Sequence, residues 1–237
     1  MKKTILAIIT LMLTIACSEK KSDKNFELTG NIKGLKRGTL YIQRIVDTAY
    51  VNIDTIQING DAHFQSNFNI NSPEMLYLFL DRGVTKSLDN NLAFFAEPSK
   101  MNIETDLESF YAKAKITGSK NHDLLEDYKK VNSKFRDQLF SLTEAKYQAM
   151  KYNKAKVLDS IIREEEHIIK RRYLYTVNYA VTNKDHEIAP YIALSEISDV
   201  ALKYLDTIQK SMTPKVAQSL YGKKLTEYYN ARKKEGR

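Results

Sequence analysis

The chain has 237 residues, with 37 Lys and Arg against 29 Asp and Glu, and it contains one cysteine and four histidines. A single cysteine excludes a dithiol redox centre and an intramolecular disulfide. The histidines show neither an HExxH motif nor a paired-ligand spacing, and they are His63, His122, His167 and His186. We therefore predict no catalytic residue, no cofactor and no metal.

An export signal begins the chain. Lys2 and Lys3 precede an apolar stretch over 4–16 that ends in small residues, the pattern of a secretory signal peptide. As a helix this stretch rises about 20 Å, whereas the hydrocarbon core of a bilayer is about 30 Å thick. We predict a cleaved signal peptide over 1–16.

The end of the apolar stretch, LTIAC at 13–17, resembles the lipobox of bacterial lipoproteins, in which the cysteine becomes the lipidated first residue. Thr14 departs from the usual leucine, while Ala16 supplies the small residue before the cut. The resemblance implies lipidation at Cys17, and several acyl chains on one residue anchor a protein stably in a membrane. The alternatives are an ordinary signal peptide that is cut nearby and leaves a free thiol at Cys17, or a cysteine that is buried as a small apolar residue.

A polar tether follows the anchor. Residues 17–25 hold no apolar side chain after the cysteine, a composition typical of a disordered segment. We expect the protein in the cell envelope, in the outer membrane facing the periplasm. Display on the cell surface, which an acidic cluster favours in some lipoproteins, is supported here only by Glu19 and Asp23.

Short segments with alternating apolar residues fill residues 26–118. The alternation predicts strands, which begin with FELTGNIK, TLYIQRIV, AYVNIDTIQI and DAHFQSNFNI and continue with MLYLFL, NLAFFAE, MNIETDL and YAKAKITG. Gly34 and Gly38 bracket a turn, and Asn59-Gly60 predicts a type I′ hairpin between its flanking strands. The segments indicate an antiparallel β-sandwich or barrel-like module.

Helical periodicity replaces this pattern over 119–237. The first helix carries an apolar stripe with Ser119 or Asn121 as its cap, and the stripe is Leu124, Tyr128, Val131, Phe135, Leu139 and Leu142. A second helix carries Leu158, Ile161, Ile162, Ile168, Ile169 and Tyr173. Shorter helices follow Pro190, Asp199 and Thr213-Pro214. The fold class is therefore α+β, with the sheet module before an α-helical region.

The basic excess lies in the helical region. Residues 18–119 hold 12 Lys and Arg against 13 Asp and Glu, whereas residues 120–237 hold 23 against 16. The lysines are interleaved with acids, and an exported protein meets little nucleic acid, so we expect no nucleic-acid partner. Solvated helix surface is the preferred interpretation, and attraction to anionic lipid headgroups is its functional rival.

Two further patterns favour a structural role over a catalytic, metal-binding or ligand-binding role. Glu164, Glu165 and Glu166 precede His167 and a basic run, and we expect helix-supporting pairs such as Glu166 with Lys170 rather than a metal or catalytic site. Eleven of the fifteen tyrosines lie from Tyr128 onward. We expect them at the edges of helix packing rather than in a ligand groove.

The sheet module resembles a known family, the domain of unknown function 4369. This domain stands at the N-terminus of many envelope lipoproteins of the thioredoxin-like, AhpC/TSA-type class. The matching features span 26–122 and are Phe26 to Gly30, GLKRGTLYI, Asp54-Thr55, Gly60 before Phe64, Pro73, Glu97 and TGSKNHD. Ser66-Asn67 and Pro98-Ser99 stand where the family commonly has glycine-containing turns.

In fuller family members a stretch like TPKVAQSLYGKKL leads into a thioredoxin fold with its CxxC, and this chain shows no CxxC. The resemblance therefore implies a non-enzymatic binding or accessory module for an unknown protein or small-molecule partner, such as a redox protein supplied in trans. The alternative is a subunit of a thiol:disulfide interchange enzyme or another envelope enzyme. For that alternative Glu97, Asp54 and the histidines are the first residues to test.

Overall fold

The computed structural model describes residues 23–83 and 88–236, so the predicted signal peptide and Cys17 lie outside the described residues. The described part forms strands Phe26–Lys33 (β1), Arg37–Val46 (β2), Ala49–Asn59 (β3), His63–Phe68 (β4), Glu74–Asp81 (β5), Asn91–Ala96 (β6), Lys100–Asp106 (β7) and Lys115–Thr117 (β8). A 3-10 turn, Leu88–Asn90 (η2), precedes β6.

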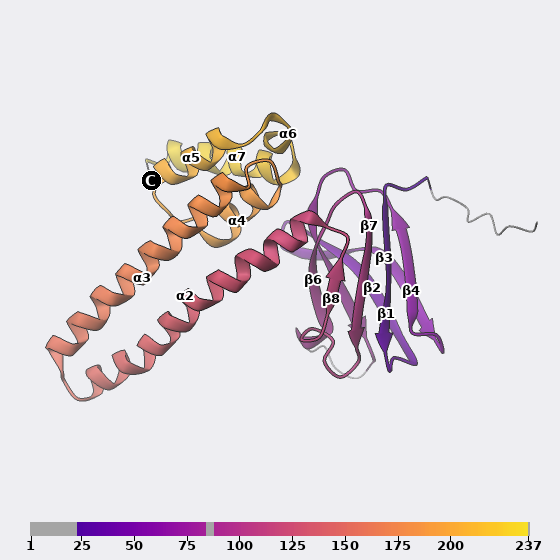
Figure 1. The fold of residues 1–237 in the computed structure, drawn as a ribbon, viewed down its shortest axis with the longest axis horizontal. Coiled ribbons are helices and arrows are strands. Elements are labelled where there is room, and N and C mark those ends of the chain that lie inside the picture. Colours follow the sequence, from indigo (N-terminus) through magenta and orange to yellow (C-terminus); the bar gives the residue numbers. More distant parts are fainter. Residues whose placement is uncertain (1–22, 84–87, 237) are drawn as a thin grey trace, which may run out of the picture.

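The strands form a sandwich of two four-stranded sheets (Figure 1). One sheet has the order β4-β1-β7-β8, and the other has the order β3-β2-β5-β6. The alternating side chains of β1 point into the core between the sheets, where Phe26, Leu28 and Ile32 are fully buried. The predicted fold class is confirmed, with one parallel pair, β1 with β7, among antiparallel neighbours.

The predicted hairpin at Asn59-Gly60 is wrong. Gly60 has the expected positive φ of 101°, but β3 pairs with β2 in one sheet while β4 pairs with β1 in the other. The turn therefore carries the chain between sheets, which places the buried Phe64 ring against Gly30, where a Cβ atom would lie 2.5 Å from the ring. The two-residue hairpin connection lies at Asp47-Thr48, where Asp47 has a φ of 56°.

Helices follow the last strand. Their bounds are Lys120–Lys151 (α2), Ala155–Thr182 (α3), Ile188–Glu196 (α4), Leu202–Ser211 (α5), Pro214–Ala217 (α6) and Leu220–Lys234 (α7). Ser119 caps α2, because its hydroxyl accepts a hydrogen bond from the His122 amide at 3.0 Å. Helix α4 begins two residues before Pro190, since proline is tolerated in a first turn, where amides have no helical acceptor.

Strands β5 and β6 are buried on both faces. Leu92, Phe94 and Ala96 point into the sandwich core, whereas Phe95 and Met75 point to the opposite face and join a second core with the helices. The ring of Phe95 contacts Tyr191 of α4 and Tyr221 of α7, with centroids 5.4 and 5.8 Å apart. The helices are therefore packed directly onto this sheet.

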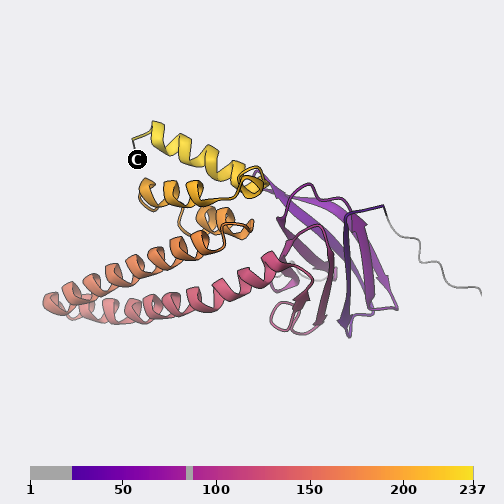
Figure 2. The ribbon, with the colours of Figure 1, turned by 45° about the horizontal axis from the view of Figure 1, so that its top comes forward.

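Helices α2 and α3 form a long antiparallel hairpin, which we call the arm. Its base packs beside α4 and α5, and its far end projects away from the sandwich (Figures 1 and 2). At 1.5 Å per residue, the 32 residues of α2 extend about 48 Å. Within the described residues, no helix combines the length and apolar character that crossing a membrane requires.

Candidate functional site

The residues that the sequence offered for enzyme chemistry lie apart. Asp54 accepts a hydrogen bond from the Ser66 hydroxyl, so it links β3 of one sheet to β4 of the other. His63 contacts Asp61 at the surface, and His186 lies 3.7 Å from Asp185. Among the described residues, no three His, Cys, Asp or Glu side chains gather into a group that could hold a metal ion.

The glutamates before His167 form a structural contact. Glu165 pairs with Lys146 across the arm, with Oε2 and Nζ 2.5 Å apart. In the described part of the chain the expected pair of Glu166 with Lys170 does not form an ion pair. His167 is exposed on α3, so this cluster assembles no site.

Glu97 and the NHD segment instead join the sandwich to the helices. Asn121 is buried, and its amide group donates hydrogen bonds to Glu97 at 2.7 Å and to Glu187 at 3.1 Å. Its carbonyl oxygen accepts from the Ile188 amide at 2.8 Å, at the start of α4. One side chain of α2 thus connects the residue that follows β6 with the start of α4, and we call this set of contacts the junction.

Tyrosines complete the junction. The Tyr221 hydroxyl accepts a hydrogen bond from the Met75 amide at 2.9 Å, and burial raises the pKa of Tyr221 well above its usual range. In the same region Ser72 accepts from the Leu220 amide at 3.0 Å. Farther along α2, the buried Tyr128 bonds Thr176 at 2.8 Å, and burial raises its pKa to about 12. These hydroxyls serve packing, in line with the preferred interpretation of the tyrosines.

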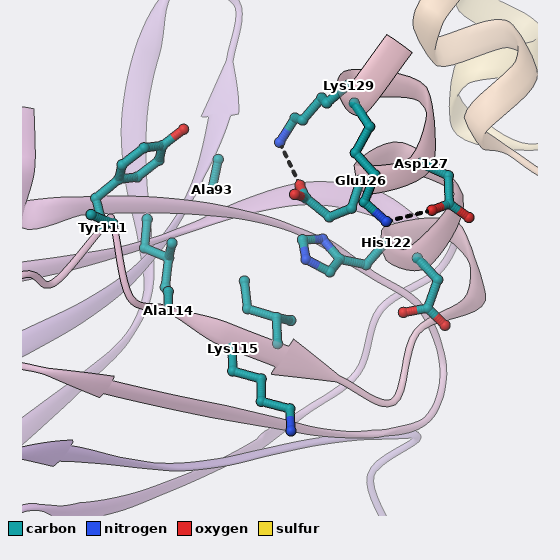
Figure 3. Close-up of a pocket in the computed structure, with 13 residues that line it drawn as sticks. Ala93, Tyr111, Ala114, Lys115, His122, Glu126, Asp127 and Lys129 are labelled. Carbon is teal, nitrogen blue, oxygen red and sulfur yellow. Dashed lines mark hydrogen bonds and ion pairs between the residues drawn. The ribbon is translucent and has the colours of Figure 1, made fainter. Parts of the chain in front are cut away.

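A groove of about 600 Å³ opens next to the junction (Figure 3). It lies where β6, at the edge of one sheet, faces β8 and the segment before it, at the edge of the other, under the first turns of α2. Leu92, Ala93, Ala114 and Ile116 give it an apolar lining. We call this cavity the β6 groove.

Strand β6 is an edge strand among the described residues, and it directs backbone groups toward the groove. Phe95 and Met75 are register partners, yet the Phe95 amide donates to His122 and the Met75 amide donates to Tyr221. They are therefore a non-hydrogen-bonded pair of the antiparallel ladder. The register of β5 and β6 has no shift, so hydrogen-bonded and non-hydrogen-bonded pairs alternate along β6. Ala93 lies two residues before Phe95 and therefore also directs its N–H and C=O away from β5. Ala93 lines the groove, and we call its outward N–H and C=O groups the open rung of β6.

His122 bonds the next outward backbone amide of β6, that of Phe95. Its Nδ1 accepts the Phe95 amide at 3.4 Å, so the proton of the neutral ring is on Nε2. The side chain is buried, and burial lowers the pKa of His122, which keeps the ring neutral near pH 7. In Figure 3 the ring extends from α2 into the groove, where Nε2–H can donate a hydrogen bond.

The charged side chains around the groove balance one another. Glu126 pairs with Lys129 at 2.8 Å and Asp127 pairs with Lys130 at 3.0 Å, both along α2. The lining contains no serine, threonine or cysteine that His122 could activate as a nucleophile. An open strand edge, an apolar wall and a polar helix face suit the binding of an extended polypeptide.

Sequence reasoning missed this groove. Ala93 sits within an apolar strand and carries no functional group, and β6 could not be recognised as an edge without the sheet order. TGSKNHD and Glu97 were recognised as a family signature, and the structure shows that this signature builds the junction beside the groove.

The comparison with known families matches the same region. The model of the family described as Domain of unknown function (DUF4369) matches residues 26–125, which covers the sandwich and the start of α2. No curated protein and no solved structure matches the chain. Residues 26–125 therefore match the DUF4369 family model, in agreement with the resemblance predicted from the order of motifs in the sequence.

Proposed function

We propose that this protein is a lipid-anchored lipoprotein of the cell envelope that binds a partner and is not itself an enzyme. The lipobox-like segment ending at Cys17 supports an anchor in the outer membrane, facing the periplasm. The described lining of the β6 groove places no serine, threonine or cysteine beside His122, which favours binding over hydroxyl or thiol catalysis. A redox protein supplied in trans is the partner class that the family resemblance favours.

The open rung of β6 is the observation that carries this proposal. An extended segment of the partner adds as a strand beside β6 and bonds the N–H and C=O of Ala93. His122 already bonds the Phe95 amide, so it ends the added strand on one side, and its Nε2–H is a further donor. Sheet edges readily accept such strands unless they are covered.

The binding proposal is tested with two substitutions at one position. Ala93→Pro removes the outward N–H without removing a bond to β5, since proline is tolerated at a sheet edge, whereas Ala93→Ser keeps the N–H. Each lipidated protein is purified from its own envelope, and the bound partner is quantified. We expect the proline variant to lose the partner and the serine variant to retain it. Equal recovery with both variants would contradict binding at β6.

The anchor and the absence of redox chemistry are tested together with Cys17→Ser. Thiol exchange needs an attacking thiolate and a second thiol to resolve the mixed disulfide, and this chain has one cysteine. The variant should incorporate no labelled acyl chain. Neither the variant nor the parent protein should reduce insulin above the buffer rate. Acyl label on the variant would contradict the anchor, and insulin reduction by the variant would contradict the non-enzyme proposal.

A further inference from the structure

The far end of the arm differs from the rest of the helical region. We call residues 145–158, which include the turn between α2 and α3, the arm tip. The turn is well bonded: the Tyr152 amide donates to the Gln148 carbonyl at 3.1 Å, and the Lys154 amide donates to the Ala149 carbonyl at 2.9 Å. The arm tip is thus a defined surface at the opposite end of the molecule from β1 (Figure 1).

The arm tip carries unbalanced positive charge. It holds four lysines and no acidic residue, although acids and bases are interleaved along the rest of α2 and α3. Lys129, Lys130 and Lys146 each form an ion pair. Beyond that point the pattern ends: no ion pair within the described residues involves the remaining lysines of the arm tip, which are Lys151, Lys154 and Lys156.

Large apolar side chains are exposed among these lysines. Tyr147, Met150 and Tyr152 are 63%, 59% and 60% exposed, and Val157 is exposed as well. The Lys151 and Lys154 ammonium groups lie 5.4 and 5.8 Å from the centroid of the Tyr152 ring. Tyrosines with an apolar body and a polar end, next to lysines with long methylene stems, are the side chains that occupy the interface of a bilayer.

We propose that the arm tip binds the surface of a bilayer that contains anionic phospholipid. The unpaired lysines match the negative surface potential of such a bilayer. The exposed tyrosine, methionine and valine side chains enter the headgroup region, as the apolar faces of peripheral helices do. This contact is separate from the β6 groove, and it requires neither the partner nor an acyl chain at Cys17.

Vesicle binding tests the proposal. All proteins carry Cys17→Ser, and all share residues 1–25, so any contribution of Lys2 and Lys3 cancels. Sedimentation is measured with phosphatidylcholine vesicles, with and without phosphatidylglycerol. The tip variant is Lys151→Gln, Lys154→Gln and Lys156→Gln, and the control with the same charge change is Lys215→Gln, Lys223→Gln and Lys234→Gln.

The tip variant should bind anionic vesicles roughly 100-fold more weakly than the parent, because each lysine near the surface contributes about a factor of five. The control should bind like the parent. An unchanged affinity of the tip variant would overturn the proposal. An equal loss in both variants would do the same, since it would assign binding to net charge rather than to the arm tip.

Fluorescence provides a second, local readout, because the chain contains no tryptophan. Tyr152→Trp places a probe at the arm tip, and Tyr111→Trp places one on the sandwich at a position that is also 60% exposed. Anionic vesicles should shift the emission of the tip probe to the blue and leave the sandwich probe unchanged. A shift of the tip probe with polyglutamate but not with vesicles would show an acidic protein surface as the ligand and overturn the membrane proposal.

Discussion

The junction and the arm tip use polar side chains in opposite ways. At the junction, Asn121 satisfies two carboxylates and a backbone amide inside the protein. At the arm tip, three lysines form no ion pair among the described residues, and the apolar side chains beside them are exposed. Burying polar groups costs free energy unless they are hydrogen-bonded, so those at the junction hold the fold together. Those at the arm tip are left for an external ligand.

The largest effect is expected from Asn121→Ala. The substitution removes three hydrogen bonds and leaves the buried Glu187 carboxylate without the Asn121 amide as its donor. We expect the free energy of unfolding to fall by about 3 kcal/mol. Gln138→Ala, on the exposed surface of the arm, should change it by less than about 0.5 kcal/mol. Urea denaturation measures both, and similar losses would mean that the junction contributes no more to stability than the exposed surface of the arm does.

A smaller effect is expected from Tyr221→Phe. The ring still packs against Phe95 and Tyr191, but the Met75 amide loses its acceptor. One unsatisfied buried amide should cost about 1 to 2 kcal/mol, measured by thermal unfolding. Tyr147→Phe removes an exposed hydroxyl at the arm tip and should cost almost nothing. If Tyr221→Phe also leaves the stability unchanged, the hydrogen bond from the Met75 amide does not hold the helices to β5.

The smallest effect on stability is expected from acidic pH. Burial lowers the pKa of His122 below the ordinary value of 6.5, so the unfolded chain binds this proton more readily than the folded protein does. Stability should therefore fall as pH drops below about 6.5 and level off below the folded pKa.

Replacing the ring isolates this effect. His122→Gln keeps an acceptor for the Phe95 amide and should flatten this part of the stability profile. His167→Gln, at an exposed site on the arm, should leave the profile unchanged. The burial of Glu74 raises its pKa and acts in the opposite direction, so the informative quantity is the difference between the variants and the parent. An identical acid response in all three proteins would contradict the buried state of His122.

Local patterns in the sequence predicted most elements. Alternation indicated the strands, and Ser119 was predicted as one of two caps of α2. Asn59-Gly60 was misread because a positive φ specifies a turn and not the sheet that the next strand joins. The parallel pairing of β1 with β7 depends on residues about 70 positions apart, which no local periodicity reveals.

The candidate sites were harder to predict for the same reason. Tyr221 lies 146 positions from Met75 in the chain, so the contact appears only when the helices pack on the sheet. The balance of charge was judged over all of residues 120–237. This average concealed the lysines of the arm tip, a segment that contains no acidic residue.

The central claim is that a partner binds at β6, and hydrogen exchange of the Ala93 amide tests it most directly. The lipidated chain is measured free and in complex with the partner that co-purifies with it. We predict that the complex slows exchange at Ala93, because its outward N–H gains an acceptor, while the amides of β3, at the other edge of the same sheet, are unchanged. Unchanged exchange at Ala93, with slowed exchange at β3 or β4, would contradict the claim.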